Sequence, residues 1–464
     1  KRDQLVGQLG EYTSVNTIQD TNGVMTVMIG NGATLVAGIT PLTISVQAGN
    51  PDPLQTQLQI NSRNGSVAID GGKLGGAIAA KMEYRDEHLL DTRNEINRLA
   101  MVISETLNQA QSQGLDLEAQ QGREIFTDIN SAGLQAGRVL NHTTNSGGLS
   151  AAVNITDVSL VPADEFEIKF DGSDYLMTNK TSGSVTNLGA AGSGTYSTGL
   201  GFEFNEVSGA PATDDKFTIR PTENSAALMK VTLTDGKGLA ASSAVGANPD
   251  ANNVSDGAVS IINVTDPVTA RAYTEGSNAK LTVDVYKNSS GTFDYRVYDA
   301  ANPPPAPVIT SGNFAAGASV IIDMPPAPAS AAFQIEISGA PVGQGSLARE
   351  KFTISDVFGP GNGSNASFIS ATQEQAIVGN STQTFSQSLA ITTADIGSKA
   401  SSAELVANTA QALFTQAYNR NQSTSGVNLD EEAANMIKFQ QAYQASSRII
   451  SVANTIFDTL LAAV

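Results

Sequence analysis

The spacing of apolar residues divides the chain into helical and extended stretches. Leucine and valine positions over residues 1–9 lie on one side of a helix. The period then changes to two around Asn22-Gly23, a pair suited to the positive φ angles of a tight hairpin turn. Short apolar runs at 35–39, 42–46 and 58–60 predict further strands. We therefore expect a helix followed by a small antiparallel β region.

A long helix is predicted from about residue 74 to residue 113. Its apolar positions recur at spacings of three, four or seven, at Ile78, Met82, Leu89, Ile96, Leu99, Ile103 and Leu107. At ~1.5 Å per residue such a helix approaches about 60 Å, which is too long for a compact globule. This length is typical of a rod.

The middle of the chain is rich in Gly, Ser, Thr, Asn and Val and reads as β structure. The motif Ser-Gly-Ala-Pro ends at Pro211 and again at Pro341, and each copy precedes a Lys-Phe-Thr-Ile run. This weak repeat predicts two related β modules, 147–239 and 257–358. We expect the stretch between them, 240–256, to be a linker.

After residues 359–363 the pattern is helical to the end of the chain. We expect residues 1–146 to form the N-terminal part of a helical stalk, and residues 359–427 to lead the chain back into this stalk. The predicted fold is an α+β multidomain protein, in which long helices from both chain ends form a stalk or coiled-coil domain. This stalk carries the inserted β-rich domains.

The last stretch, 428–464, has the most regular pattern. Asn428 is a candidate helix N-cap, and three acidic residues over 430–432 complement the dipole of the first turn. A seam of about four heptads follows, with spacings of three and four, at Met436, Phe439, Tyr443, Ser446, Ile450, Ala453, Phe457, Leu460 and Val464. A second apolar line widens it, at Ile449, Val452 and Ile456. So wide an apolar surface requires a partner.

Two interpretations of the seam remain open. The helix either docks on its own domain or pairs with a segment of the same or a neighbouring subunit. The second is favoured because the seam continues to the last residue. Lys1 begins in the middle of a helical pattern, so we also expect the chain to be truncated at its N-terminus, without a segment that pairs with the seam.

Composition narrows the range of functions. The net charge is −19, from 45 acidic and 26 basic residues, which argues against nucleic acid and anionic membrane as partners. No apolar run reaches the ~18 residues of a membrane-spanning helix. Cysteine is absent, which excludes disulfides, thiolate metal sites and cysteine nucleophiles. Its absence fits chance or export through a narrow channel about equally well.

Candidate chemistry is sparse. The only histidines are His88 and His142, 54 residues apart, with no short-spaced carboxylate pair that would complete a metal site. Residues 250–257 look superficially like a calcium loop, but Val254 and Ile261 stand where ligands are needed. The glycines over 359–363 lack the lysine of a phosphate loop. We expect no catalytic, metal or cofactor site.

Both ends of the chain resemble the flagellar hook-associated protein 1 family. At the C-terminus the resemblance lies in Ser425 to Asn435, Phe439 to Ser446 and Ala453 to Leu461. At the N-terminus it lies in Lys1 to Leu5, Met28 to Gly32, Gly72 to Gly76, Gly114 to Leu117 and Ile125-Phe126. The second β module, roughly 257–358, departs from the shorter members of the family.

The resemblance implies a secreted structural protein at the junction of hook and filament, and not an enzyme. Its terminal helices would pair into the tubular core of the flagellum. The implied partners are the hook protein, the next junction protein, an export chaperone at the C-terminal helix, and further copies of the chain in a ring or helical array. The protein would lie outside the cell, exported by the flagellar apparatus without a cleaved signal peptide. The predicted assembly interface is Leu429, Met436, Phe439, Tyr443, Ile450, Ala453, Phe457 and Leu460.

Two other functions stay open. The exposed β modules, 147–239 and 257–358, with their Thr- and Asn-rich surface, would suit an adhesin or a glycan-binding module on a helical stalk. An enzyme inserted in the β region is the third hypothesis. It would depend on one of the two histidines, which have no motif beside them.

Overall fold

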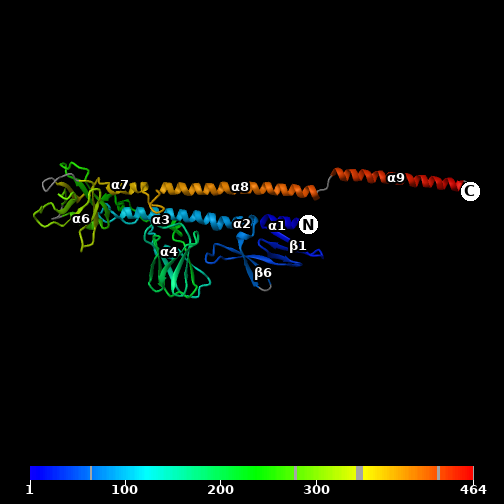
Figure 1. Cartoon of the computed structure of the whole chain (residues 1–464), viewed down its shortest axis with the longest axis horizontal. Coiled ribbons are helices and arrows are strands. Elements are labelled where there is room, and N and C mark those ends of the chain that lie inside the picture. Colours follow the sequence, from blue (N-terminus) through cyan, green and yellow to red (C-terminus); the bar gives the residue numbers. More distant parts are fainter. Residues whose placement is uncertain (63–64, 276–279, 341–348, 426–428, 463–464) are drawn as a thin grey trace. The chain divides into compact units, whose positions relative to one another are not determined.

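The computed structural model describes residues 1–62, 65–275, 280–340, 349–425 and 429–462. It consists of two compact units, Lys1–Thr392 and Thr393–Val464. Long helices and β-rich inserted domains alternate along the chain (Figure 1). The predicted α+β multidomain fold is confirmed in these elements.

Residues 15–69 form two small antiparallel sheets, which we call the arm. A helix, α1 (Arg2–Tyr12), leads into it. The strand orders are β1-β2-β3-β4 and β5-β6-β7, with β1 (Val15–Gln19), β2 (Met25–Ile29), β3 (Ala33–Ala37), β4 (Thr40–Pro41), β5 (Thr43–Gln47), β6 (Gln57–Ser62) and β7 (Gly65–Ile69). Gly23 has a φ of +79° between β1 and β2, as the predicted hairpin requires. The core beneath the arm is small, with Ile29, Leu74 and Ala79 buried.

A helical rod follows the arm, as the apolar spacing over 74–113 predicts. It consists of η1 (Gly71–Lys73), α2 (Gly76–Glu83), a π-helical turn η2 (Tyr84–Leu89) and α3 (Leu90–Ser112). The π-helical turn was not predicted, because one widened turn barely changes the apolar period. The rod appears in light blue in Figure 1.

Three chain segments meet at the C-terminal end of α3. The fully buried Gln111 side chain donates to the carbonyl of Gly238 (2.8 Å) and accepts from the amide of Ala240 (3.2 Å). Asn365 Nδ2 donates to the carbonyls of Ala110 and Ala240. The last carbonyls of a helix lack partners within it, so Asn365 caps α3 at Ala110, and both side chains hold the other two segments against the helix.

The first β module comprises two sheets, after a short α4 (Ala132–Gly137). Its strands are β9 (Val139–Asn141), β10 (Ser150–Ile155), β11 (Phe166–Phe170), β12 (Asp174–Asn179), β13 (Val185–Ala190), β14 (Thr195–Ser197), β15 (Phe202–Ser208) and β16 (Lys216–Ile219). The sheet orders are β13-β12-β11-β16-β9 and β10-β15-β14. Its core includes Met101 and Val102 of α3, so the module is packed directly on the rod.

The second β module repeats this arrangement strand for strand. Its strands are β18 (Val245–Pro249), β19 (Ala258–Val264), β20 (Lys280–Lys287), β21 (Phe293–Asp299), β22 (Thr310–Phe314), β23 (Val320–Met324), β24 (Phe333–Ser338) and β25 (Glu350–Asp356). The sheet orders are β22-β21-β20-β25-β18 and β19-β24-β23. The helix α6 (Pro267–Thr274) follows β19. This shared topology agrees with the repeat seen in the sequence.

The two modules also share a polar anchor beside the Lys-Phe-Thr-Ile strand. Asn145 donates to the carbonyl of Lys216 and accepts from its amide, and Asn253 does the same with Lys351. The acidic residue before each lysine is buried and accepts backbone amides of the loop that precedes the small sheet. The two modules therefore fix the same loop by the same chemistry.

Two predicted boundaries are wrong. β9 lies before residue 147 and pairs with β16. β18 lies inside the predicted linker 240–256 and pairs with β25, from Val245 opposite Asp356 to Pro249 opposite Phe352. Both strands are short, and their partners lie far along the chain, so local alternation does not identify them.

The remaining elements lie between the rod, the two modules and the C-terminal helices. They are β8 (Gly114–Leu115), α5 (Ser225–Leu228), η3 (Gly236–Gly238), β17 (Ser242–Ser243), α7 (Ser364–Ala371) and η5 (Thr372–Glu374). The long α8 (Phe385–Ser425) begins in the first unit and continues into the second, which also contains α9 (Leu429–Ala462). These are the long orange and red helices of Figure 1.

Candidate functional site

The predicted seam lies on α9 and is exposed. Its six large side chains are between 61% and 77% exposed; they are Met436, Phe439, Tyr443, Ile450, Phe457 and Leu460. Ala453 is exposed as well. Residues three and four apart share one face of an α-helix. The structure therefore brings these side chains together on a single helix face, which we call the α9 seam.

Three predicted positions fall at the limits of the described structure. Leu429 is the first residue of α9, but its side chain lies outside the described part. Asn428, the predicted N-cap, and Val464, the predicted end of the seam, lie outside the described residues. The acidic residues 430–432 do occupy the first turn of α9.

The apolar surface of α9 is wider than the seam. Ile449, Val452 and Ile456 are 55–70% exposed and form the predicted second line. Ile437 and Leu461 are exposed as well and were not predicted. Contiguous exposed apolar surface on this scale is typical of a protein interface.

A further exposed apolar surface lies on α8. Val406 and Leu413 are both more than 60% exposed. Phe414 and Tyr418, which sequence reasoning missed, stack with their ring centroids 6.2 Å apart. The four-residue spacing of two aromatic residues was the available signal.

The two histidines lie in different surroundings. His142 Nε2 lies 3.1 Å from Thr218 Oγ1, and burial lowers the pKa of His142 below its usual value. His88 belongs to η2. Within the described ranges, His, Asp and Glu side chains form no group of three suited to a metal ion. No helix in the described part combines the length and apolar character that crossing a membrane requires.

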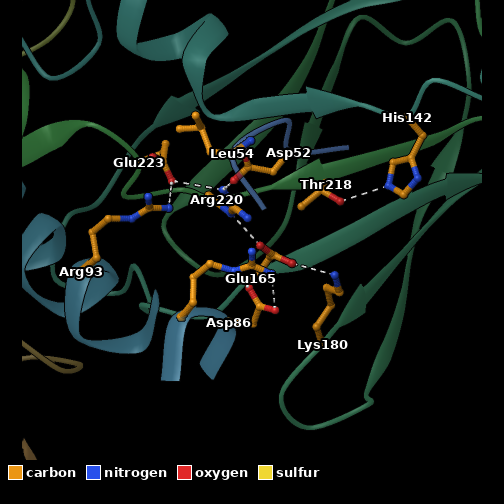
Figure 2. Close-up of polar contacts among 11 residues, drawn as sticks. Asp52, Leu54, Asp86, Arg93, His142, Glu165, Lys180, Thr218, Arg220 and Glu223 are labelled. Carbon is orange, nitrogen blue, oxygen red and sulfur yellow. Dashed lines mark hydrogen bonds and ion pairs between the residues drawn. The ribbon is translucent and has the colours of Figure 1, made fainter. Parts of the chain in front are cut away.

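The structure contains a buried cluster of charges that the sequence did not indicate. We call it the Arg220 node (Figure 2). The Arg220 side chain, 3% exposed, donates from Nη1 to Asp52 at 2.7 Å and from Nε to Glu165 at 2.6 Å. Glu223 lies 3.8 Å from Nη1 and pairs with Arg93 of α3 at 3.1 Å. The node therefore joins the arm, the rod and the first β module.

The pKa values of the node reflect competing effects. Burial alone would raise the pKa of Asp52, but hydrogen bonds from Arg220 and from the amide of Leu54 bring it below its usual value. Burial likewise opposes ionisation of Glu165, whereas the hydrogen bond from Lys180 and the charge of Arg220 lower its pKa. Both carboxylates are therefore ionised at neutral pH, and the node is an ion-pair network.

Three family models match separate parts of the chain. The model of the flagellar hook-associated protein FlgK helical domain matches residues 1–126. The D2-like domain of flagellar hook-associated protein 1 matches 140–221. The C-terminal model of the flagellar basal body rod FlgEFG proteins matches 419–463, which includes α9. Together these matches cover both chain ends and the first β module.

Whole proteins give the same result. Flagellar hook-associated protein 1 of Escherichia coli (strain K12) is 23% identical over 99% of this chain, and that of Salmonella typhimurium (strain LT2) is 22% identical. The chain spans 63% of the length of these relatives. The flagellar hook junction protein FlgK from Burkholderia pseudomallei has a similar fold, with a TM-score of 0.69 and 23% identity over 91% of this chain and 77% of that one. The predicted resemblance to flagellar hook-associated protein 1 is confirmed.

Proposed function

We propose that this chain, a homologue of flagellar hook-associated protein 1 over nearly its whole length, is a structural subunit of the hook-filament junction. The proteins that it resembles are structural components of the flagellum rather than enzymes. The observation that carries the proposal is the α9 seam, an exposed apolar face in the segment that matches a flagellar axial model. Such a face needs a partner helix, and a flagellum supplies one from each neighbouring subunit.

The seam specifies how the subunit would assemble. Met436, Tyr443, Ile450 and Phe457 follow one another at intervals of seven, the period of helices that supercoil around each other. We infer that α9 pairs with a helix from the N-terminal end of the same or a neighbouring subunit. The exposed apolar line on α8 is a second surface that we expect to be covered in the assembled stalk.

The partners follow from the same proposal. They are the hook protein on one side, the next junction protein on the other, and further copies of the chain in a ring or helical array. Before assembly, an export chaperone would cover the α9 seam, because an exposed apolar helix aggregates. The subunit would act outside the cell, after export through the flagellar apparatus without a cleaved signal peptide.

The experiment replaces apolar side chains on the α9 seam in the bacterium that encodes the protein. The test variant carries Phe439→Ser, Tyr443→Ser and Phe457→Ser. Its matched control carries Gln441→Ser, Gln444→Ser and Thr455→Ser on the opposite face of α9, so both variants gain the same number of serines. Flagella are isolated and probed for the subunit, and swimming is measured.

We expect the test variant to be missing from flagella and the cells to lose motility, because three large apolar side chains leave the helix pair. The control variant should assemble and support swimming. Normal incorporation of the test variant would refute a role of the seam in assembly. Loss of incorporation in both variants would show that assembly depends on the helix content of α9 and not on the seam.

A further inference from the structure

We propose that the arm is a lever, hinged at Gly75-Gly76 and held against the first β module by a polar latch. The latch is the turn 48–56 between β5 and β6. It closes on the Arg220 node, on Thr143 and on Arg85. Opening it would turn the arm about the hinge without unfolding the module or the rod.

The hinge is where the chain enters and leaves the arm. Gly75 and Gly76 have φ angles of +69° and +63°, a region that favours glycine. A Cβ on Gly76 would lie 2.7 Å from backbone atoms of Tyr12 and Thr13, so the two segments touch. The amide of Ser14 donates to the carbonyl of Leu74 at 2.8 Å. The arm is thus attached to its flanking helices at this narrow crossing and by a small core, in which Ile29 of the arm packs with Leu74 and with Ala79 of α2.

The latch consists of hydrogen bonds and an ion pair. Asp52 accepts from Arg220 at 2.7 Å, and Asn50 Oδ1 accepts from the amide of Thr143 at 2.9 Å. The carbonyl of Thr56 accepts from Arg85 of η2 at 2.9 Å. Leu54, the large apolar side chain of the turn, is 81% exposed, so it does not anchor the turn.

The latch turn lines a cleft of about 470 Å³. Asp52, Leu54 and Gln55 line it from the turn, and Leu89, Arg93 and Ile96 line it from η2 and α3. Water can replace polar contacts at such a cleft without exposure of a core. Opening the latch therefore exchanges its few polar contacts with water, and the arm then turns on the small core of Ile29, Leu74 and Ala79.

The joint between the module and the rod is of a different kind. Met101 and Val102 of α3 are fully buried in the core of the first module. Separating these two parts would expose apolar surface, which is strongly unfavourable. The module and the rod therefore form one rigid body, and the arm is the part that can move against it.

The test measures distances between spin labels by pulsed electron paramagnetic resonance on the full chain. The chain has no cysteine, so Thr21→Cys in the arm and Thr186→Cys in β13 give a unique label pair. A second pair, Gln109→Cys with Thr186→Cys, reports on the rod and the module. The latch variant combines Asn50→Ala with Asp52→Asn. Lys180→Ala is the control, because it breaks the Lys180–Glu165 pair and touches no arm residue.

We expect one narrow distance for the arm pair in the parent chain and in Lys180→Ala. In the latch variant a second distance should appear, while the rod pair keeps its single distance. An unchanged arm distance in the latch variant would overturn the proposal. So would a change in both pairs, because that outcome means general loosening of the module. The unchanged rod pair also shows that the variant is folded.

Discussion

The buried acidic anchor of each β module makes a sharp prediction, because the two copies differ in one detail. Asp215 is 2% exposed and uses both carboxylate oxygens as acceptors. Oδ1 accepts from the amide of Ser146 at 2.8 Å, and Oδ2 accepts from the amides of Gly147 and Ala212 at 3.0 and 2.8 Å. In Asp215→Asn, one of these oxygens becomes an N–H₂ group that faces a backbone donor.

The equivalent residue of the second module has a more adaptable partner. Glu350 Oε1 accepts from the amides of Val254 and Ser255, and Oε2 accepts from the hydroxyl of Ser255. In Glu350→Gln, the amide group can keep its oxygen on the two backbone donors. The hydroxyl can then rotate and accept from the new N–H₂, since a serine hydroxyl both donates and accepts.

The expected magnitudes follow from this difference. Asp215→Asn leaves one buried amide unpaired and weakens two charge-assisted hydrogen bonds, a loss of about 3 kcal/mol of module stability. Glu350→Gln weakens its hydrogen bonds without leaving a backbone amide unpaired, a loss of about 1 kcal/mol. At ~1.4 kcal/mol per tenfold change, the first substitution should speed amide exchange about 100-fold and the second about 5-fold.

Hydrogen-deuterium exchange of the full chain, followed by mass spectrometry, separates the two modules. Peptides from the β9 to β16 region should lose protection in Asp215→Asn, and peptides from the β18 to β25 region should change little. The reverse pattern is expected in Glu350→Gln, with a smaller loss of protection. Equal effects of the two substitutions would refute the argument, because then the hydroxyl of Ser255 would not compensate.

The Arg220 node should lose its contribution to the stability of the folded state in acid. The pKa values of Asp52 and Glu165 are lowered in the folded state, so their contribution is complete above the unfolded values of about 4 to 4.5 and is lost as the pH falls further. The difference in urea midpoint between the parent and Asp52→Asn should therefore shrink below about pH 4, and a constant difference would contradict this assignment. It should be possible to delete the second β module, because the chain enters and leaves it at one place. The amide of Val357, just after β25, donates to the carbonyl of Ala244, just before β18, at 3.2 Å. Deleting 245–356 should leave the exchange of the first module unchanged and cost about 1.5–3 kcal/mol at the rod end, where Leu115 loses its cover. Retained assembly with lost attachment to surfaces would support an adhesive role of this module, whereas lost assembly would place it among the junction contacts.

Several features of the fold could be predicted from local patterns. The apolar period over 74–113 identified the rod, and Asn22-Gly23 identified the first hairpin. The repeated Lys-Phe-Thr-Ile run indicated two related modules, which share one strand order. These predictions succeeded because a helix face or a two-residue turn depends on neighbours within a few positions.

The candidate site also has a part that local patterns predicted and a part that they did not. The α9 seam could be predicted, because its residues lie on one helix and its face needs no other part of the chain to form. The exposed aromatic pair of α8 was missed, although its four-residue spacing was visible. The boundary of the first module and the linker 240–256 were wrong, because β9 and β18 become strands only through distant partners.

The sequence by itself determined which stretches are helical, which are extended, and where a helix presents an apolar face. Only the tertiary structure decided that Asp52, Glu165 and Arg220 form one buried node. These residues are far apart along the chain, and each alone resembles an ordinary surface charge. Periodicity records neighbours along the chain, whereas ion pairs depend on distances in space, which exist only once the arm, the rod and the module have folded together.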